Sequence, residues 1–211
     1  MTVNGRRRLR YVSIGLAVLT VGLILILASQ TLGIGTAVFN KPPPNAPKTN
    51  RPTTAEIDTY SVPPQLPKYL SITKFGVKSR VRALGLTADN QLRSPANVYD
   101  VGWYTASSKP GSNGAMLVDG HVSSWTTNGV FYHLKDLVAG DTIQIERGDG
   151  KVFSYQVVRK QVYDAANVDM AAALAPVDAT HPGLNLITCT GNVIKGSNSF
   201  SKRLIVFTRQ L

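Results

Sequence analysis

Three side chains in the C-terminal half of the chain have the types and positions needed for nucleophilic chemistry. Cys189, the only cysteine, ends the short apolar run 184–188, and a loop rich in Gly, Ser and Asn follows it. Arg203 then opens the next apolar run, and His121 ends a third run that begins at residue 117. A thiol, an imidazole and a guanidinium at three strand ends can act as nucleophile, acid/base and oxyanion stabiliser.

Cys189 also has a simpler interpretation, a buried structural thiol, because cysteine is among the most buried residue types. Its position favours the nucleophile, since the apolar run gives way to a polar loop at this residue. A nearby cation would lower the pKa of the thiol and raise the thiolate fraction. An unpaired cysteine outside the cytoplasm is a liability unless it has a function.

The three histidines differ in their surroundings. His133 lies in an apolar local sequence and His181 precedes a proline, so both are interpreted as structural or loop residues. His121 is the candidate acid/base. Asp119 is a possible orienter of His121, but adjacent strand residues point to opposite faces, so it is left out of the catalytic set.

Arg203 is either an edge arginine that reaches solvent or a permanent cation directed into the site. In the second case it would bind the substrate backbone and the oxyanion of a tetrahedral intermediate. Thr188, next to the nucleophile, is expected to help shape the same pocket.

Short strands must position these residues, because apolar or alternating runs separated by turn residues follow one another from residue 69 onward. The clearest hairpin joins 142–146 to 152–157 around the turn 148–150. Helix is scarce, with short turns expected at 132–137 and 169–174. The pattern predicts an all-β fold, a closed or nearly closed barrel.

Four segments make up the chain: a basic segment 1–10, an uncharged segment 11–39, a Pro-rich linker 40–66 and a domain 67–211. The core of the second segment is 18 residues long, which predicts an uncleaved transmembrane signal anchor rather than a signal peptide. The arginines would remain cytoplasmic and the domain would lie outside. The linker should be an extended spacer, with residues 60–67 alternatively wrapped on the domain.

The formal charge of +11 does not indicate a nucleic-acid-binding protein. The densest basic cluster, residues 6–10, flanks the apolar segment, where it serves membrane orientation. The sequence has no Cys/His pairs at zinc spacing, no EF-hand loop and no phosphate-binding glycine loop, so no metal or cofactor is expected.

The Leu-x-Thr-Cys of 186–189, the Gly-His of 120–121 and the strand opened by Arg203 resemble the signature of the sortases. These are membrane-anchored cysteine transpeptidases of Gram-positive-type bacteria, and the resemblance covers about residues 67–211. It implies an eight-stranded β-barrel with short helices. It also implies that His121, Cys189 and Arg203 are catalytic, with Thr188 and Val122 supporting substrate binding.

The same resemblance implies a reaction and partners. Cys189 would cleave an LPXTG-like sorting signal of a secreted protein between Thr and Gly, through a thioacyl-enzyme. An amine of a peptidoglycan precursor would then accept the protein. The enzyme would be a monomer with one membrane span and would face the cell wall.

The short sequence motifs at 84–86, 102–104 and 120–122 look most like those of the actinobacterial class F or its relative class E. Only eight residues follow Arg203 and the linker has no Asp-Pro-aromatic lid, which argues against the pilus-polymerising class. One departure is Asn185, which precedes Leu186 where the family usually has threonine.

Two other functions remain open from the residues. One is a hydrolytic cysteine protease on a β-barrel, and the other is a tethered wall-binding β-domain without enzymatic activity. An L,D-transpeptidase is discounted, because His121 and Cys189 are 68 positions apart rather than almost adjacent.

Overall fold

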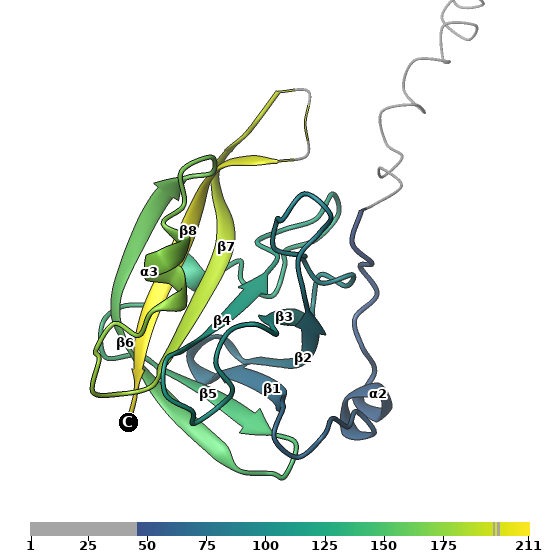
Figure 1. Ribbon diagram of the computed structural model, residues 1–211. Helices are drawn as coiled ribbons and strands as arrows, with labels where there is room; N and C mark the ends of the chain where they lie inside the picture. Colours follow the sequence, from purple (N-terminus) through teal and green to yellow (C-terminus); the bar gives the residue numbers. More distant parts are fainter. Residues whose placement is uncertain (1–45, 196, 198) are drawn as a thin grey trace, which may run out of the picture. The chain divides into compact units, whose positions relative to one another are not determined.

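The computed structural model describes residues 46–211 except residues 196 and 198 (Figure 1). The basic segment 1–10 and the expected membrane anchor 11–39 lie outside the described residues. Within the described part of the chain, no helix combines the length and the apolar character needed to span a bilayer.

Eight strands form a closed barrel in the order β1-β2-β3-β4-β7-β8-β6-β5. The strands are β1 (Pro67–Ile72), β2 (Val77–Leu84), β3 (Val101–Tyr104), β4 (Ala115–Gly120), β5 (Thr142–Arg147), β6 (Val152–Asp164), β7 (Gly183–Val193) and β8 (Phe200–Gln210). The described helices are short: α2 (Thr54–Asp58), α3 (Met170–Leu174) and the 3₁₀ turns η1 (Thr73–Phe75) and η2 (Leu134–Asp136). The predicted eight-stranded barrel with short helices is confirmed.

The predicted hairpin of β5 and β6 is present, with Ile143 opposite Tyr155 and Ile145 opposite Phe153. These apolar residues point inward, since alternate residues of a strand share a face. Gly150 in the turn has φ 84°, a left-handed conformation that glycine adopts without strain. Beyond the hairpin, β6 continues to Asp164 because its second half pairs with β8.

Two strand pairs, β2–β3 and β4–β7, are parallel, and every other pair in the barrel is antiparallel. The parallel pairing of β4 and β7 determines which candidate residues lie close together. Parallel strands end at the same edge, so the residues after β4 and those late in β7 lie together.

Apolar side chains cover both faces of the sheet at β4, β7 and β8. The barrel interior holds Val118, Leu186 and Val206, whereas Leu117, Ile187 and Phe207 belong to a second cluster with Ala173 of α3. Burial on both faces explains why these strands read as continuous apolar runs rather than alternating ones. In Figure 1, α3 lies beside β7 and β8.

Asn185, which stands where a threonine was expected, has a structural role in this chain. Its buried amide donates hydrogen bonds of 2.9 Å to the carbonyl oxygens of Ala173 and Ala175. These carbonyls lie at the C-terminal end of α3, where helix carbonyls lack partners within the helix. Asn185 therefore fixes α3 on the strand that carries the cysteine.

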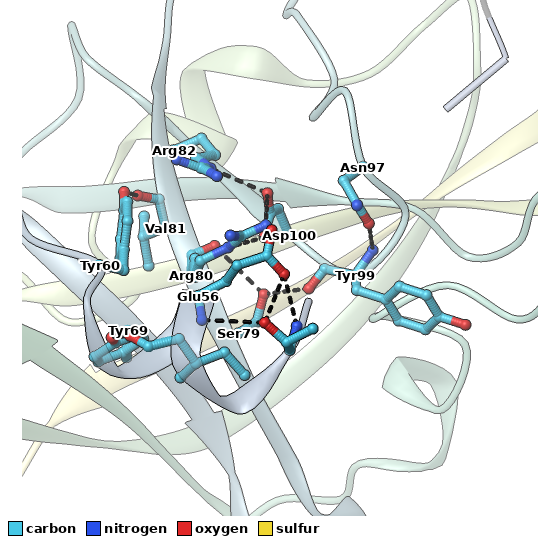
Figure 2. Close-up of polar contacts among 12 residues, drawn as sticks. Glu56, Tyr60, Tyr69, Ser79, Arg80, Val81, Arg82, Asn97, Tyr99 and Asp100 are labelled. Atoms are coloured by element: carbon cyan, nitrogen blue, oxygen red, sulfur yellow. Dashed lines mark hydrogen bonds and ion pairs between the residues drawn. The ribbon is translucent and has the colours of Figure 1, made fainter. Parts of the chain in front are cut away.

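The described part of the expected linker, residues 46–66, carries helix α2 and belongs to the same compact unit as the barrel. This segment, termed the strap below, pairs through Lys48 with Asn97 and bonds through the Tyr60 hydroxyl to the carbonyl of Val81 at 2.5 Å (Figure 2). The hydroxyl of Tyr69 donates in turn to the carbonyl of Ile57. The contact of Tyr60 agrees with the alternative in which residues 60–67 wrap on the domain, whereas the pairing of Lys48 was not expected from the proline content.

Candidate active site

Cys189 lies where β7 leaves the core. The six preceding strand residues, 183–188, are buried, whereas Cys189 is half-buried and the last three residues of the strand are exposed. The thiol therefore lies at the surface of the barrel, as its position before a polar loop suggested.

Arg203 faces Cys189 across the sheet. The antiparallel register of β7 and β8 pairs these two residues directly, which sets their Cβ atoms about 5 Å apart. The guanidinium Nη1 donates to the backbone carbonyls of Phe200 and Lys202, both at 3.0 Å. These bonds hold the guanidinium near the start of β8, where its charge still acts on the thiol of Cys189.

His121 comes to the same place from β4. The parallel register pairs Val118 with Leu186 and Asp119 with Ile187. The pairing ends there, but the hydroxyl of Thr188 still reaches the carbonyl of Gly120, so the residues that follow, Cys189 and His121, leave their strands close together. Because neighbouring strands lie about 4.8 Å apart, the segments carrying imidazole, thiol and guanidinium lie side by side across β4, β7 and β8.

A hydrogen bond holds the His121 ring. Its Nε2 lies 2.8 Å from the carbonyl oxygen of Pro95. A carbonyl can only accept, so Nε2 carries a proton and Nδ1 is the nitrogen that can take up or release a second one. The loop containing Pro95 is in turn paired with the strap, because the amide of Lys48 donates to the carbonyl of Ala96 at 2.7 Å.

Thr188 and Val122, the two residues expected to support the site, form hydrogen bonds with the backbone near His121. The buried Thr188 hydroxyl donates to the carbonyl of Gly120 at 2.7 Å, which ties the strand of Cys189 to the residue before His121. The carbonyl of Val122 accepts from the amide of Gly129 at 2.9 Å and so closes the loop that follows His121.

Asp119, which was left out of the catalytic set, lies close enough to His121, Arg203 and Cys189 for the charges of these groups to act on one another. Burial raises the pKa of its carboxyl, while a hydrogen bond from Ser94 and the charges of His121 and Arg203 oppose that rise. Its carboxylate also acts on the thiol of Cys189. Strand alternation does not separate Asp119 from His121, because the two residues are two positions apart and alternate residues of a strand share a face.

Burial raises the pKa of the Cys189 thiol above its ordinary value. The charge of Arg203 lowers this pKa and that of Asp119 raises it, but burial is the largest effect. The thiol is therefore predominantly protonated at neutral pH, and a base must remove its proton before the sulfur can attack.

The other histidines do not join this group. His133 pairs with Asp136 at 2.9 Å and His181 with Asp178 at 2.8 Å, each three residues away on an exposed surface. In the part of the chain that the structure describes, no three His, Cys, Asp or Glu side chains gather as a metal-ligand set.

Taken together, the arrangement supplies a nucleophile, a proton carrier and a cation at one edge of the barrel. Such a set suits acyl transfer, in which sulfur attacks a carbonyl carbon and the carbonyl oxygen becomes negative.

Comparison with known proteins agrees with this chemistry. Residues 70–211 match the family described as the sortase domain. Comparison with curated protein sequences finds no significant match.

Solved structures share the fold at low sequence identity. A Clostridium perfringens sortase D5 transpeptidase is 23% identical, with 68% of this chain and 77% of the other covered at a TM-score of 0.50. The lid mutant of sortase A from Corynebacterium diphtheriae is 22% identical, with 70% of each chain covered and a TM-score of 0.52. The lid mutant of Streptococcus agalactiae sortase C1 is 21% identical, with coverage of 75% and 76% and a TM-score of 0.52.

Proposed function

Because the chain belongs to the sortase family, we propose that it is a cysteine transpeptidase in which Cys189, His121 and Arg203 are the catalytic residues. The observation that supports these roles best is the register: Cys189 and Arg203 are direct cross-strand partners, and His121 follows directly on β4, which is paired in parallel with the strand of Cys189.

In the proposed first half-reaction, His121 Nδ1 takes the thiol proton and the sulfur attacks the carbonyl carbon of threonine in an LPXTG-like sorting signal. The negative charge on the carbonyl oxygen is stabilised by the guanidinium of Arg203. When the Thr–Gly bond breaks, the imidazolium gives its proton to the departing glycine amine, and a thioester with Cys189 remains.

In the second half-reaction an acceptor amine attacks the thioester. His121 removes a proton from the amine, the C–N bond forms, and the C–S bond breaks to restore the Cys189 thiol. The acceptor that we propose is an amine of a peptidoglycan precursor, and the donors are secreted proteins with an LPXTG-like signal.

The enzyme is further proposed to act as a monomer held at the cell membrane by residues 11–39, with its domain facing the cell wall. The charge-free segment behind a basic flank supports this placement. The short sequence motifs around Gly85, Trp103 and His121 support assignment to class F or E rather than to the pilus-polymerising class.

Product analysis tests the reaction. The full chain in detergent is incubated with a short LPXTG peptide and triglycine, and the products are separated by mass. A peptide extended by triglycine at threonine is expected, and Cys189→Ala should abolish it.

The alternative of a hydrolytic protease predicts a threonine carboxylate whether or not triglycine is present. If a panel of sorting-motif variants gives neither product, the transpeptidase assignment is wrong and a binding domain becomes the better interpretation.

A further inference from the structure

A cavity of about 500 Å³ lies between the strap, the first half of β2 and the segments 99–100 and 127–133. Cys189, His121 and Arg203 do not line it. Its volume is within the range of ligand pockets and much larger than a bare ion needs.

The wall of this cavity contains an excess of positive charge. Arg80 forms a two-pronged ion pair with Asp100, at 2.8 and 3.1 Å, and Arg82 contacts the same carboxylate at 3.0 Å (Figure 2). Only 11% of the Arg80 side chain and 4% of the Asp100 side chain are exposed. Arg80 and Asp100 therefore pair in a poorly solvated part of the wall. Arg82 lies outside the lining and 39% of its side chain is exposed, but it adds a second positive charge to the same carboxylate.

Two further cations line the cavity from its exposed side. The guanidinium of Arg51 stacks 4.4 Å from the ring centre of Tyr99, and the ammonium of Lys78 lies 4.7 Å from that of Tyr69. Stacking on a ring leaves the hydrogen-bond donors at the edge of a guanidinium available for a ligand. In the described chain neither cation forms a salt bridge.

The remaining wall suits a peptide better than a bare anion. Phe75, Tyr99 and Tyr132 provide aromatic surface, and Thr127 and Asn128 carry side chains that can hydrogen-bond to amide groups. A side-chain carboxylate matches the fork of an arginine guanidinium, and a peptide that carries it can also contact the aromatic and hydrogen-bonding side chains of this wall.

We propose that this cavity, formed by the strap and the first half of β2 and separate from the Cys189 site, binds a peptide that carries side-chain carboxylates. A glutamate of the peptide pairs with Arg51 and Lys78 at the mouth, and an adjacent apolar residue packs on the rings of Tyr99 and Phe75. The strap contributes Arg51 directly, so the site exists only while the strap is docked.

The probe is the peptide acetyl-Gly-Glu-Phe-Glu-Gly-amide, and its control replaces both glutamates with glutamine. Binding is measured by calorimetry to the full chain in neutral detergent, with Cys189→Ala so that no acylation contributes. The acidic peptide should bind at least about tenfold more tightly than its amide control, as expected for charge-assisted hydrogen bonds. Equal binding of the two peptides overturns the proposal.

The double variant Arg51→Gln with Lys78→Gln should lose about tenfold in affinity for the acidic peptide. The matched control is Lys109→Gln with Lys151→Gln, which removes the same charge from two exposed lysines outside the cavity and should leave the affinity unchanged. Equal losses in both double variants would indicate attraction by net charge alone and would contradict the site.

Inorganic phosphate gives a separate readout. At millimolar concentration and constant ionic strength it should displace the peptide only weakly. Complete displacement by phosphate would assign the cavity to phosphate groups and overturn the peptide assignment. Because every arm lacks the thiol, failure here is distinguishable from failure of the transpeptidase assignment.

Discussion

The resting thiol of Cys189 is shaped by three competing influences. Burial raises its pKa, the cation of Arg203 lowers it, and the carboxylate of Asp119 raises it. The site therefore holds its nucleophile mainly as a neutral thiol, and it depends on His121 to take the proton during the reaction.

Replacing Arg203 with glutamine removes the cation that both favours the thiolate and stabilises the oxyanion. We expect the acylation rate to fall about 100- to 1000-fold, as for the loss of an oxyanion donor. The rate of iodoacetamide alkylation at pH 8 should also fall, because the pKa of the thiol rises further. Arg203→Lys, which retains a charge but not the planar fork, should keep the alkylation rate while acylation remains impaired.

Asp119→Asn should lower the pKa of the Cys189 thiol, whereas the loss of Arg203 raises it. Without the carboxylate charge the pKa of Cys189 falls, so more thiolate is present at any pH below that pKa. The alkylation rate at pH 8 should rise and its pH profile should move to lower pH. The exposed Asp58→Asn serves as the control, and an unchanged profile for Asp119→Asn would exclude Asp119 from the electrostatics of the site.

At this scale the sequence identified Cys189, Arg203 and His121 as candidates through residue type and position at strand ends. It also named Asp119 as a possible orienter of His121 but left it out of the catalytic set, and the effect of its charge on Cys189 became visible only in the structure. The direction of the Cys189 pKa shift also required the structure.

Among the elements, the loop that follows β4 controls the position of His121. A Cβ added at Gly129 would lie 2.1 Å from the backbone oxygen of His121, so any side chain must push the two backbone segments apart. The loop is held closed by hydrogen bonds from Gly129 to Val122 and from Phe131 to His121, of 2.9 and 3.0 Å.

Gly129→Ala should therefore displace His121 and lower the acylation rate by about 100-fold, the effect of a displacement of about 1 Å at a reacting group. Steady-state kinetics with an LPXTG peptide measure this loss. Gly85→Ala is the matched control, because nothing lies within 4 Å of the added Cβ. If Gly129→Ala keeps full activity, the loop does not position the imidazole.

The strands of the barrel were largely predictable, since turn residues and apolar runs mark most of them, and the β5–β6 hairpin follows from its alternation. The parallel register of β4 and β7 could not be predicted, because the residues around Leu117 do not specify which distant strand pairs with β4. The extension of β6 to Asp164 was also missed, as exposed polar residues occupy that half.

For the whole molecule, the strap is held on the barrel at β2, the strand that also carries the two ion pairs of Asp100. Tyr60 contacts the backbone of β2, and Arg80 and Arg82 of the same strand pair with Asp100 (Figure 2). The proline content of the segment favoured an extended spacer and left open that residues 60–67 wrap on the domain. It gave no indication that the part before residue 60 also contacts the barrel, as Lys48 does.

Asp100→Asn should lower the free energy of unfolding by about 3 kcal/mol, since it leaves the nearly buried Arg80 without its counter-charge. Urea denaturation of the full chain in detergent measures the change. Asp149→Asn, which breaks an ion pair with Arg147 at the surface of the hairpin turn, should shift the midpoint much less. Equal shifts would show that burial does not strengthen the Asp100 pairs.

The central claim is that a peptide carbonyl is transferred to the sulfur of Cys189. The most direct measurement is peptide mapping by mass spectrometry. The full chain is incubated briefly with an LPXTG peptide, and the reaction is then quenched at low pH. We predict a thioester carrying the peptide up to threonine on the fragment that contains Cys189, and much less of it in His121→Ala. Cleavage of the peptide in the Cys189→Ala variant, or an acyl group mapped to any other residue, would contradict the account.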